Sequence, residues 1–287
     1  MSKPLFKIRE IKAKSILQPS GLPVDWVVNP YTGCRFGCKY CYAYFVGRFR
    51  HPDEAWGTYV DIKVNAPELL KKELTNKLKR TKKKHLGEIF FSSVTDPYQG
   101  VEAKYKITRQ CLQVLRDLNY QGPISILTKS HLVTRDIDIF KKLKNIAVGL
   151  TVTSTGDPIS QYLETYAPPN QERIKALKKL HQAGLKTYAF VGPLLPHFVW
   201  QEKKIEALLK KLKQTGVSYI YLEHINLSKY IRNRLFQFLK DKPELLKLFQ
   251  QAQKPEYRKK LDSLLMRLVK KTKLRLAYQK PFYHKDT

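Results

Sequence analysis

Three of the four cysteines in this 287-residue chain lie within one short segment. Cys34, Cys38 and Cys41 form a C-x3-C-x2-C pattern, which brings three thiolates together in one loop. Thiolate is a soft ligand that favours iron–sulfur clusters, zinc or copper over hard, oxygen-preferring ions. A cubane cluster has four corners, and this loop supplies ligands for three. The spacing therefore indicates a [4Fe-4S] cluster whose fourth iron is open to a small molecule.

A zinc ion is the alternative occupant of the cysteine loop. It would need a fourth ligand, which His51, His85 or Cys111 could supply. Structural zinc sites, however, usually combine two spaced pairs of ligands rather than one run of three cysteines. Cys111 also shares a helical stripe with Ile107 and Leu115, which predicts a buried structural thiol rather than a catalytic hydrogen donor.

The cysteine loop follows the first of six segments that have the composition of β-strands. These segments are residues 27–31, 88–94, 124–128, 147–153, 186–191 and 217–222. Amphipathic helical patterns separate them, at about residues 65–78, 107–118, 134–143, 170–184 and 205–216. Such alternation is typical of parallel strands joined by crossover helices. The chain is therefore predicted to be an α/β protein built as a partial parallel (β/α)6 barrel.

Parallel barrels carry their chemistry on the loops that follow the carboxyl ends of the strands. The cysteine loop, the turn at Thr95 and Asp96, Lys129, and the residues around Ser154 all follow predicted strands. We therefore expect them to meet in one site. Asp96 precedes a proline and could instead serve only the turn, and Lys129 could be one of many solvated lysines.

Further polar and aromatic residues follow the last two predicted strands. Glu223, His197 and His224 lie at or just beyond the strand ends. Glu223 could order a substrate or a proton, with a local structural hydrogen bond as the alternative. Trp200 could stack on a base or could close the edge of the core.

The chain divides into three predicted parts: a lead-in over residues 1–26, a core domain over 27–227 and a basic helical extension over 228–287. In the extension only helical patterns remain, at about residues 230–239 and 257–269, with lysine and arginine on the outer faces. The chain lacks an N-terminal apolar run of signal-peptide length and any apolar run long enough to span a membrane. Together with the unpaired cysteine count, this predicts a cytoplasmic protein without a membrane partner.

The charge balance is strongly basic. Lysine and arginine number 54 against 24 aspartates and glutamates, so the formal net charge is +30 at pH 7. An excess of this size attracts polyanions, which predicts DNA or RNA as a partner. Lysine-rich surfaces also occur in proteins from hot environments, but those usually enrich glutamate as well. Residues 71–84 hold eight basic residues and one acid, which is either a nucleic-acid contact or a solvated helix face.

The run Gly33-Cys34-Arg-Phe-Gly-Cys38-Lys-Tyr40-Cys41-Tyr42, with an aromatic residue before its third cysteine, resembles the signature of radical S-adenosylmethionine (SAM) enzymes. The resemblance spans about residues 27–226 and is closest to the branch that contains spore photoproduct lyase and DNA-repair-photolyase-like relatives. Supporting segments are residues 95–99, 128–130 and 135–136, together with Arg173. The resemblance implies that the three cysteines hold a [4Fe-4S] cluster. It also implies that SAM is cleaved reductively to a 5′-deoxyadenosyl radical, which abstracts hydrogen from a substrate.

The same resemblance implies roles for residues that follow the later strands. Asp96 would bind the amino group of the SAM methionine, with Thr95 beside it. Lys129 would pair with the carboxylate of that methionine. Thr153 and Ser154 would contact the ribose or the carboxylate. These roles come from position in the family pattern and are expectations about the structure.

Two tyrosines complete the implied site. Tyr42 would present its backbone to adenine, and both Tyr40 and Tyr42 match tyrosines assigned to radical transfer in the lyase branch. That branch carries a hydrogen-donating cysteine after its second strand, and residues 90–96 of this chain contain none. Reversal of a thymine dimer is therefore not the expected reaction.

Three functions remain open from the sequence. The first is a radical SAM enzyme, lyase-like or modifying, that acts on nucleic acid in repair or modification. The second is a radical SAM enzyme that acts on a peptide or a small molecule. The third is a non-catalytic zinc module that binds nucleic acid. For either enzyme, the resemblance implies a reducing partner of the flavodoxin or ferredoxin type.

Overall fold

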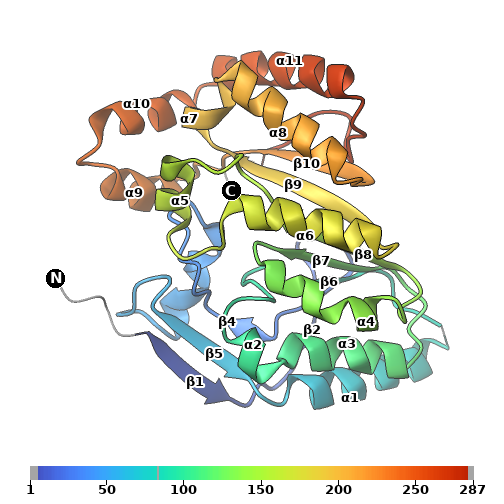
Figure 1. Cartoon of the computed structure of the whole chain (residues 1–287). Helices are drawn as coiled ribbons and strands as arrows, with labels where there is room; N and C mark the ends of the chain where they lie inside the picture. The colour runs from blue at the N-terminus through green and yellow to red at the C-terminus, as the bar shows by residue number, and fades with distance from the viewer. Residues whose placement is uncertain (1–5, 83, 284–287) are drawn as a thin grey trace.

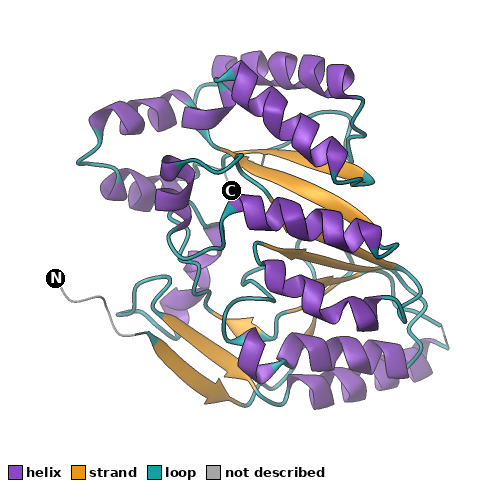
Figure 2. Cartoon of the chain, viewed as in Figure 1, coloured by secondary structure: helices purple, strands orange, loops and turns teal. Residues whose placement is uncertain are grey.

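The computed structural model describes residues 6–82 and 84–283. Its centre is a seven-stranded sheet in the order β10-β9-β8-β7-β6-β3-β2 (Figures 1 and 2). Six strands run parallel in chain order: β3 (Trp26–Val28), β6 (Ile89–Phe91), β7 (Ile124–Thr128), β8 (Ile146–Thr151), β9 (Lys186–Leu194) and β10 (Tyr219–His224). At one edge, β2 (Leu17–Pro19) runs antiparallel to β3. The predicted α/β class with six parallel strands is confirmed.

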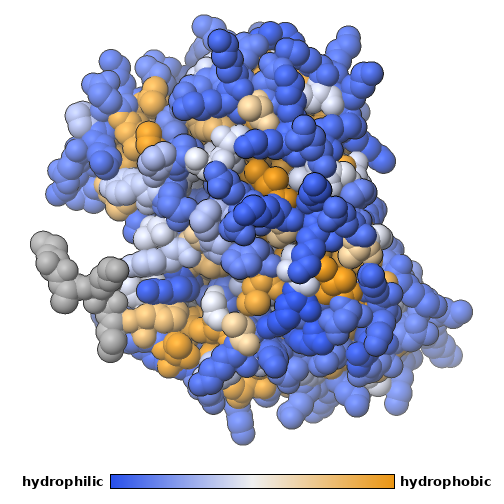
Figure 3. Space-filling view, in the orientation of Figure 1, coloured by the Kyte–Doolittle hydropathy of each residue, from blue (hydrophilic) through white to orange (hydrophobic). Residues whose placement is uncertain are grey.

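Helices cover the outer face of this sheet, and helices and strands alternate along the chain (Figure 1). The longer helices of the core are α1 (Ala66–Thr81), α3 (Ile107–Asp117), α6 (Asn170–Gln182) and α8 (Glu202–Gln214). Shorter ones are α2 (Glu102–Tyr105), α4 (Ile137–Phe140), α5 (Pro158–Glu164) and α7 (Pro196–Val199). Each long helix buries the apolar stripe that its sequence shows; Leu70 and Leu74, four residues apart on α1, are fully buried. Polar side chains cover most of the face seen in Figure 3.

Two elements differ from the sequence-based expectation. The first predicted strand, residues 27–31, ends early because Pro30 has no backbone N–H to continue the ladder. The chain then enters β4 (Tyr31–Thr32), which belongs to a separate sheet with β1 (Lys7–Ile11) and β5 (Tyr59–Lys63). The helix predicted over residues 134–143 is a 3₁₀ turn, η2 (His131–Asp136), followed by the single turn of α4. At their junction Asp136 is buried and accepts hydrogen bonds from neighbouring elements.

The predicted helical extension is confirmed, with one more helix than expected. It contains α9 (Lys229–Phe238), α10 (Pro243–Gln251) and α11 (Pro255–Thr272), and α11 packs against α8. The chain then returns to the sheet, where Leu276 and Phe282 form parallel bridges with Ile220 and Glu223 of β10. Within residues 6–82 and 84–283, none of the helices combines the length and the apolar character needed to cross a membrane.

Candidate active site

The cysteine loop joins β4 to a 3₁₀ helix, η1 (Tyr42–Phe49), at the carboxyl end of the parallel strands. Cys34 and Cys38 are buried and Cys41 is partly exposed. Gly33, with φ of +84°, supplies a left-handed turn, and a Cβ there would lie 2.6 Å from the carbonyl oxygen of Tyr59. Inside the loop, the N–H of Cys41 donates to the carbonyl of Cys38 at 3.2 Å. The loop therefore has one defined backbone shape.

The turn after β6 fastens the start of the loop. The Thr95 hydroxyl donates to the carbonyl oxygen of Gly33 at 2.5 Å. The Gln99 side chain donates to the same oxygen at 3.2 Å and accepts from the N–H of Arg35 at 2.8 Å. Thr95 was expected beside Asp96 at the methionine of SAM, and the structure places its hydroxyl on the cysteine loop. Sequence reasoning marked the segment 95–99 but gave Gln99 no role.

The C-terminal extension fastens the end of the loop. Arg234, on α9, donates to the carbonyl oxygens of Cys38 and Cys41 at 3.0 and 3.3 Å. Its guanidinium lies 4.6 Å from the ring centroid of Tyr44, which stacks on Tyr230. A partly buried positive charge therefore lies directly behind two of the three cysteines. Sequence reasoning missed Arg234, because nothing in the local pattern of α9 distinguishes it from its basic neighbours.

The three thiols have the surroundings of metal ligands. Burial raises the pKa of all three thiols, that of Cys38 to about 12. The positive charge of Lys129 opposes this rise at Cys38 and Cys41 without cancelling it. Backbone N–H groups of Ala43 and Tyr44 point to the Cys41 sulfur. Buried thiols of this kind become thiolates when a bound metal supplies the compensating charge. The donor set thus fits a thiolate-bound cluster.

The described residues contain no group of three His, Cys, Asp or Glu side chains arranged around one metal ion. In a cubane cluster each thiolate binds a different iron atom, so the cysteines need not converge on a single point.

The three alternative zinc ligands all lie in other surroundings. His51 contacts Asp61 at 2.8 Å and also Glu54. His85 accepts a hydrogen bond from the N–H two residues further on. Cys111 is fully buried on α3, as predicted for a structural thiol.

Asp96 links the turn after β6 to the end of β7 through hydrogen bonds. Its carboxylate accepts from the Thr128 hydroxyl at 2.6 Å, from the Lys129 N–H at 2.8 Å and from the Tyr98 N–H at 2.9 Å. Burial raises its pKa, and these hydrogen bonds oppose that shift. Lys129, at the end of β7, extends past this pair, and its ammonium lies 5.8 Å from the ring centroid of Tyr40. The two residues are therefore adjacent, as their strand-end positions predict.

Tyr40 belongs to a buried network, of which the sequence had indicated some members but not all. Its hydroxyl donates to Glu164, and Glu164 forms a 2.5 Å ion pair with Arg173, which is fully buried. Burial alone would raise the pKa of Glu164. The charges of Arg173 and Lys129, together with the hydrogen bonds from Arg173 and Tyr40, outweigh burial, so the pKa is lowered. Arg173 was singled out in the sequence, whereas Glu164 was not. Both charges are therefore present and paired beneath the cysteine loop.

Thr153 and Ser154 lie just past the end of β8 and are both buried. The amide of Asn170 accepts from the Thr153 N–H at 2.9 Å and donates to the Ser154 hydroxyl at 3.2 Å. The Thr153 hydroxyl also donates to Glu164 at 3.3 Å. Thr153 therefore belongs to the network of Glu164 and Arg173, and Ser154 is linked to it through Asn170.

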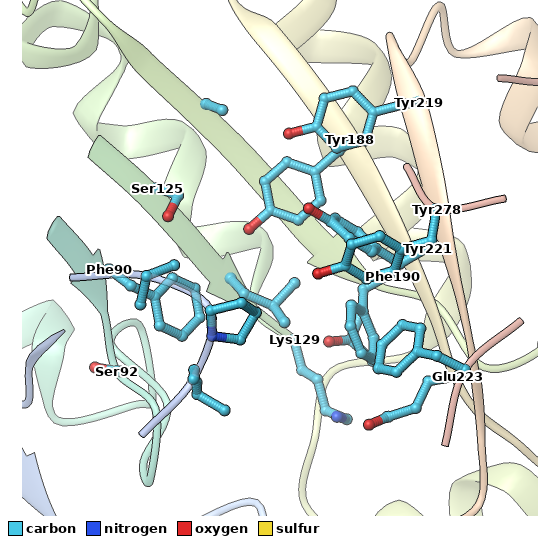
Figure 4. Close-up of a pocket in the computed structure, with 18 of the residues that line it drawn as sticks. Phe90, Ser92, Ser125, Lys129, Tyr188, Phe190, Tyr219, Tyr221, Glu223 and Tyr278 are labelled. Atoms are coloured by element: carbon cyan, nitrogen blue, oxygen red, sulfur yellow. The ribbon is translucent and has the colours of Figure 1, made fainter. Parts of the chain in front are cut away.

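A cavity of about 440 Å³ opens beside the cysteine loop, on the inner face of the sheet (Figure 4). It unites several of the predicted residues, namely Cys38, Cys41, Tyr40, Tyr42, Lys129 and Glu223. Among the described residues, its lining does not include Cys34, Thr95, Asp96, Thr153 or Ser154. Figure 4 shows Lys129 and Glu223 pointing toward one another. The predicted site is therefore split between a cavity wall and a supporting layer behind it.

The two histidines near the last strands have structural partners. His197, on α7, contacts Asp157 at 3.0 Å, and His224 contacts Asp262 of α11 at 2.7 Å. Trp200 packs edge-on against Tyr257. Each of these three residues therefore has a structural partner.

Comparison with known proteins identifies the class. Residues 28–212 match the family model of the radical SAM superfamily, which is more than half of the chain. The chain therefore belongs to the radical SAM superfamily, whose members use a [4Fe-4S] cluster and SAM. It is a radical SAM enzyme, which decides against the non-catalytic zinc module.

Individual relatives agree with this assignment. The chain is 34% identical over 269 residues to an uncharacterised protein of Methanocaldococcus jannaschii, covering 92% of this chain and 94% of that protein. It is 25% identical over 201 residues to a radical SAM Nalpha-GlyT isomerase of Pseudomonas phage M6, covering 69% of this chain and 39% of that protein. Among solved structures, spore photoproduct lyase complexed with dinucleoside spore photoproduct has a similar fold. The TM-score is 0.61 at 16% identity, over 80% of this chain and 65% of the lyase chain.

Proposed function

We propose that this radical SAM enzyme acts on nucleic acid, in a repair or modification reaction. The observation that carries the proposal is the distribution of charge. The formal net charge is +30. Among the described residues, five acids are buried, Asp61, Asp96, Glu102, Asp136 and Glu164, whereas Arg173 is the only buried lysine or arginine. The surface is therefore more basic than the composition alone indicates, and such a surface attracts the phosphates of a nucleic acid.

The named relatives support the same class of substrate. Spore photoproduct lyase, which shares the fold, is known in complex with a dinucleoside spore photoproduct. The phage relative is named as an isomerase of Nalpha-GlyT. Because the chain lacks a cysteine in residues 90–96, a modification or a different repair reaction is favoured over thymine-dimer reversal.

In this proposal the three cysteines hold the cluster, and the cysteine end of the cavity receives SAM. The cluster and SAM together supply a 5′-deoxyadenosyl radical that removes hydrogen from the substrate. Lys129 is placed to meet the carboxylate of SAM, and Tyr42 lines the cavity beside Cys41. Asp96 and Thr153 act from behind, because their polar atoms are bonded to strand ends. The walls exclude water, which protects a radical reaction.

The reductant remains a prediction from the family resemblance. A basic surface would attract an acidic reductant by the same electrostatics that attract nucleic acid. Competition between such a partner and an oligonucleotide would therefore be expected at low salt.

Two measurements test the proposal on anaerobically reconstituted protein. The first is the affinity for single-stranded DNA, duplex DNA and RNA as a function of salt. We expect log K to fall linearly with log salt, by about 0.7 to 0.9 for each phosphate contact. The second is 5′-deoxyadenosine formation with dithionite, with and without the oligonucleotide. We expect the nucleic acid to change its rate.

The cysteines provide the control for this experiment. Replacement of Cys38 by alanine should abolish 5′-deoxyadenosine formation and leave the oligonucleotide affinity within about twofold, because the basic surface is untouched. Salt-independent or absent binding, together with intact SAM cleavage, would contradict the nucleic-acid substrate. It would favour the peptide or small-molecule alternative.

A further inference from the structure

The cavity extends well beyond the cysteine loop. Ser125 and Leu127 are alternate residues of β7, Lys129 follows directly after its end, and all three line the cavity. The cavity therefore follows the strand from its carboxyl end to its amino end. At that far end Glu88 accepts a hydrogen bond from the Ser125 hydroxyl at 2.5 Å. This second half lies away from the cysteines and needs an occupant other than the cluster.

One wall of this half is aromatic. Its rings come from β9, β10 and the returning C-terminal segment, and they are Tyr188, Phe190, Tyr219, Tyr221, Tyr278 and Phe282. The rings of Tyr188 and Tyr219 are parallel within 3°, with centroids 5.4 Å apart. Tyr221 meets Tyr188 and Tyr278 edge-on at 5.6 and 5.4 Å. Figure 4 shows the labelled rings grouped on one side of the cavity, facing Phe90 and Ser125.

The position of Tyr188 depends on a glycine. A Cβ on Gly149 of β8 would lie 2.2 Å from the Tyr188 ring, so the ring lies directly over this residue. The Tyr188 hydroxyl then donates to the carbonyl oxygen of Ile126 on β7 at 2.8 Å. The side chain thus reaches across β8 from β9 and is held at its far end. The Tyr188 ring therefore provides a flat, fixed aromatic surface on the inner face of the sheet.

Polar groups stand where the two halves of the cavity meet. Lys129 offers hydrogen-bond donors and Glu223 offers acceptors, and both reach into the same space. The whole cavity of about 440 Å³ includes the cysteine end assigned to SAM, so the aromatic half suits one small flat group and is far too small for a stacked duplex. Flat rings together with a few polar groups match the faces and edges of a nucleobase.

Resting on the nucleic-acid substrate proposed above, we infer that the aromatic half of the cavity binds one unpaired nucleobase. This base belongs to a single strand or is rotated out of a duplex, because a base in the stack cannot reach the cavity. The phosphates stay outside on the basic surface. The base stacks on the tyrosine wall and Glu223 faces its polar edge, whereas Lys129 serves the carboxylate of SAM.

The test compares two oligonucleotides that differ by one base. Both are single-stranded and short, and one carries an abasic site at the position that the other fills with a base. At fixed salt we expect the intact oligonucleotide to bind about tenfold more tightly, as stacking of one base on aromatic side chains predicts. The variant Tyr221→Leu should lose most of this difference and keep its affinity for the abasic strand.

Two further variants provide a second test of the aromatic wall and a control outside the cavity. Tyr278→Leu removes a wall residue that is 45% exposed, so it tests the wall even if Tyr221→Leu does not fold. Trp200→Leu removes an equally exposed aromatic residue outside the cavity and should keep the full difference between the oligonucleotides. Equal, salt-dependent affinities for the two strands would overturn the base pocket and leave the nucleic-acid substrate standing. Binding to neither strand would overturn both.

Discussion

At the scale of single residues, the most constrained group in the site is the Glu164 carboxylate. It accepts from the Tyr40 hydroxyl in the cysteine loop, pairs with Arg173 and accepts from the Thr153 hydroxyl. All of these groups are buried, so the carboxylate must satisfy two hydroxyls and a guanidinium at once. A buried ion pair of this kind is costly to break, because the remaining charge stays buried without a counter-charge or water to solvate it.

Replacement of Glu164 by glutamine is expected to destabilise the fold by about 3–5 kcal/mol, since Arg173 is left buried without a counter-charge. Urea denaturation of the wild type and the variant gives the free-energy difference. The matched control is Glu172→Gln, because Glu172 pairs with Lys175 at 2.8 Å on the exposed side of α6, the helix that carries Arg173. That change should cost less than about 1 kcal/mol. Equal effects of the two substitutions would contradict this account.

At the scale of elements, the helical extension acts on the barrel at two points. Arg234 of α9 holds the carbonyls of Cys38 and Cys41, and Asp262 of α11 contacts His224 at the end of β10. The segment after α11 then pairs with β10 and supplies part of the cavity wall. The extension is therefore part of the active-site architecture as well as a cover for the sheet.

Loss of the Arg234 charge should make the cluster harder to reduce, because a nearby positive charge stabilises the more negative, reduced state. We expect Arg234→Gln to lower the midpoint potential, and Arg234→Lys to lower it less. A redox titration followed by electron paramagnetic resonance measures this directly. Arg232→Gln, on the same helix but bonded to Gln253, is the control and should leave the potential unchanged. An unchanged potential in Arg234→Gln would show that the arginine serves only the loop conformation.

Acid should weaken the attachment of α11 through His224. Burial lowers the pKa of this imidazole below its usual value of 6.5, so the unfolded chain binds a proton that the folded chain does not. Stability is therefore fully present above about pH 6.5 and falls as the pH drops below that value. Chemical denaturation at pH 7.5 and 5.5 should show a smaller loss for His224→Gln than for the wild type. His85→Gln, which removes an exposed imidazole, should keep the wild-type loss.

Sequence patterns predicted the elements well and their long-range contacts poorly. The six parallel strands could be predicted because each is a short apolar run between helical stripes, and the strand-end residues then fall at one edge. Three of the residues that fix the cysteine loop were not predicted. Gln99 contacts a residue 64 positions away, Glu164 contacts one 124 positions away, and Arg234 contacts one 193 positions away. Local periodicity contains no information about such partners.

At the scale of the whole molecule, the position of charge matters more than its sum. Arg48 and Arg50 are exposed and follow the cysteine loop on or just after η1, whereas Lys71 and Lys72 are exposed on α1, on the outer face of the sheet. A substrate that enters at the cysteine end would place its phosphates near the first pair.

Two double variants with the same change in net charge test this expectation. Arg48→Gln with Arg50→Gln should weaken oligonucleotide binding and reduce the salt slope by about two, one unit for each lost phosphate contact. Lys71→Gln with Lys72→Gln should leave the slope nearly unchanged. The measurement is the binding constant at several salt concentrations. The opposite ranking would mean that nucleic acid approaches over α1.

The Arg234 contact also bears on how the enzyme is made. The cysteine loop leaves the ribosome long before its distal partners, since Arg234 lies 193 residues after Cys41 and the wall residue Phe282 comes later still. Until those partners arrive, the loop lacks its clamp and the cavity lacks a wall. Nascent thiols are then open to iron and sulfide, and equally to oxygen. Docking of the extension is therefore a late step in folding, after which the loop is held by Arg234 and the cavity has its last wall.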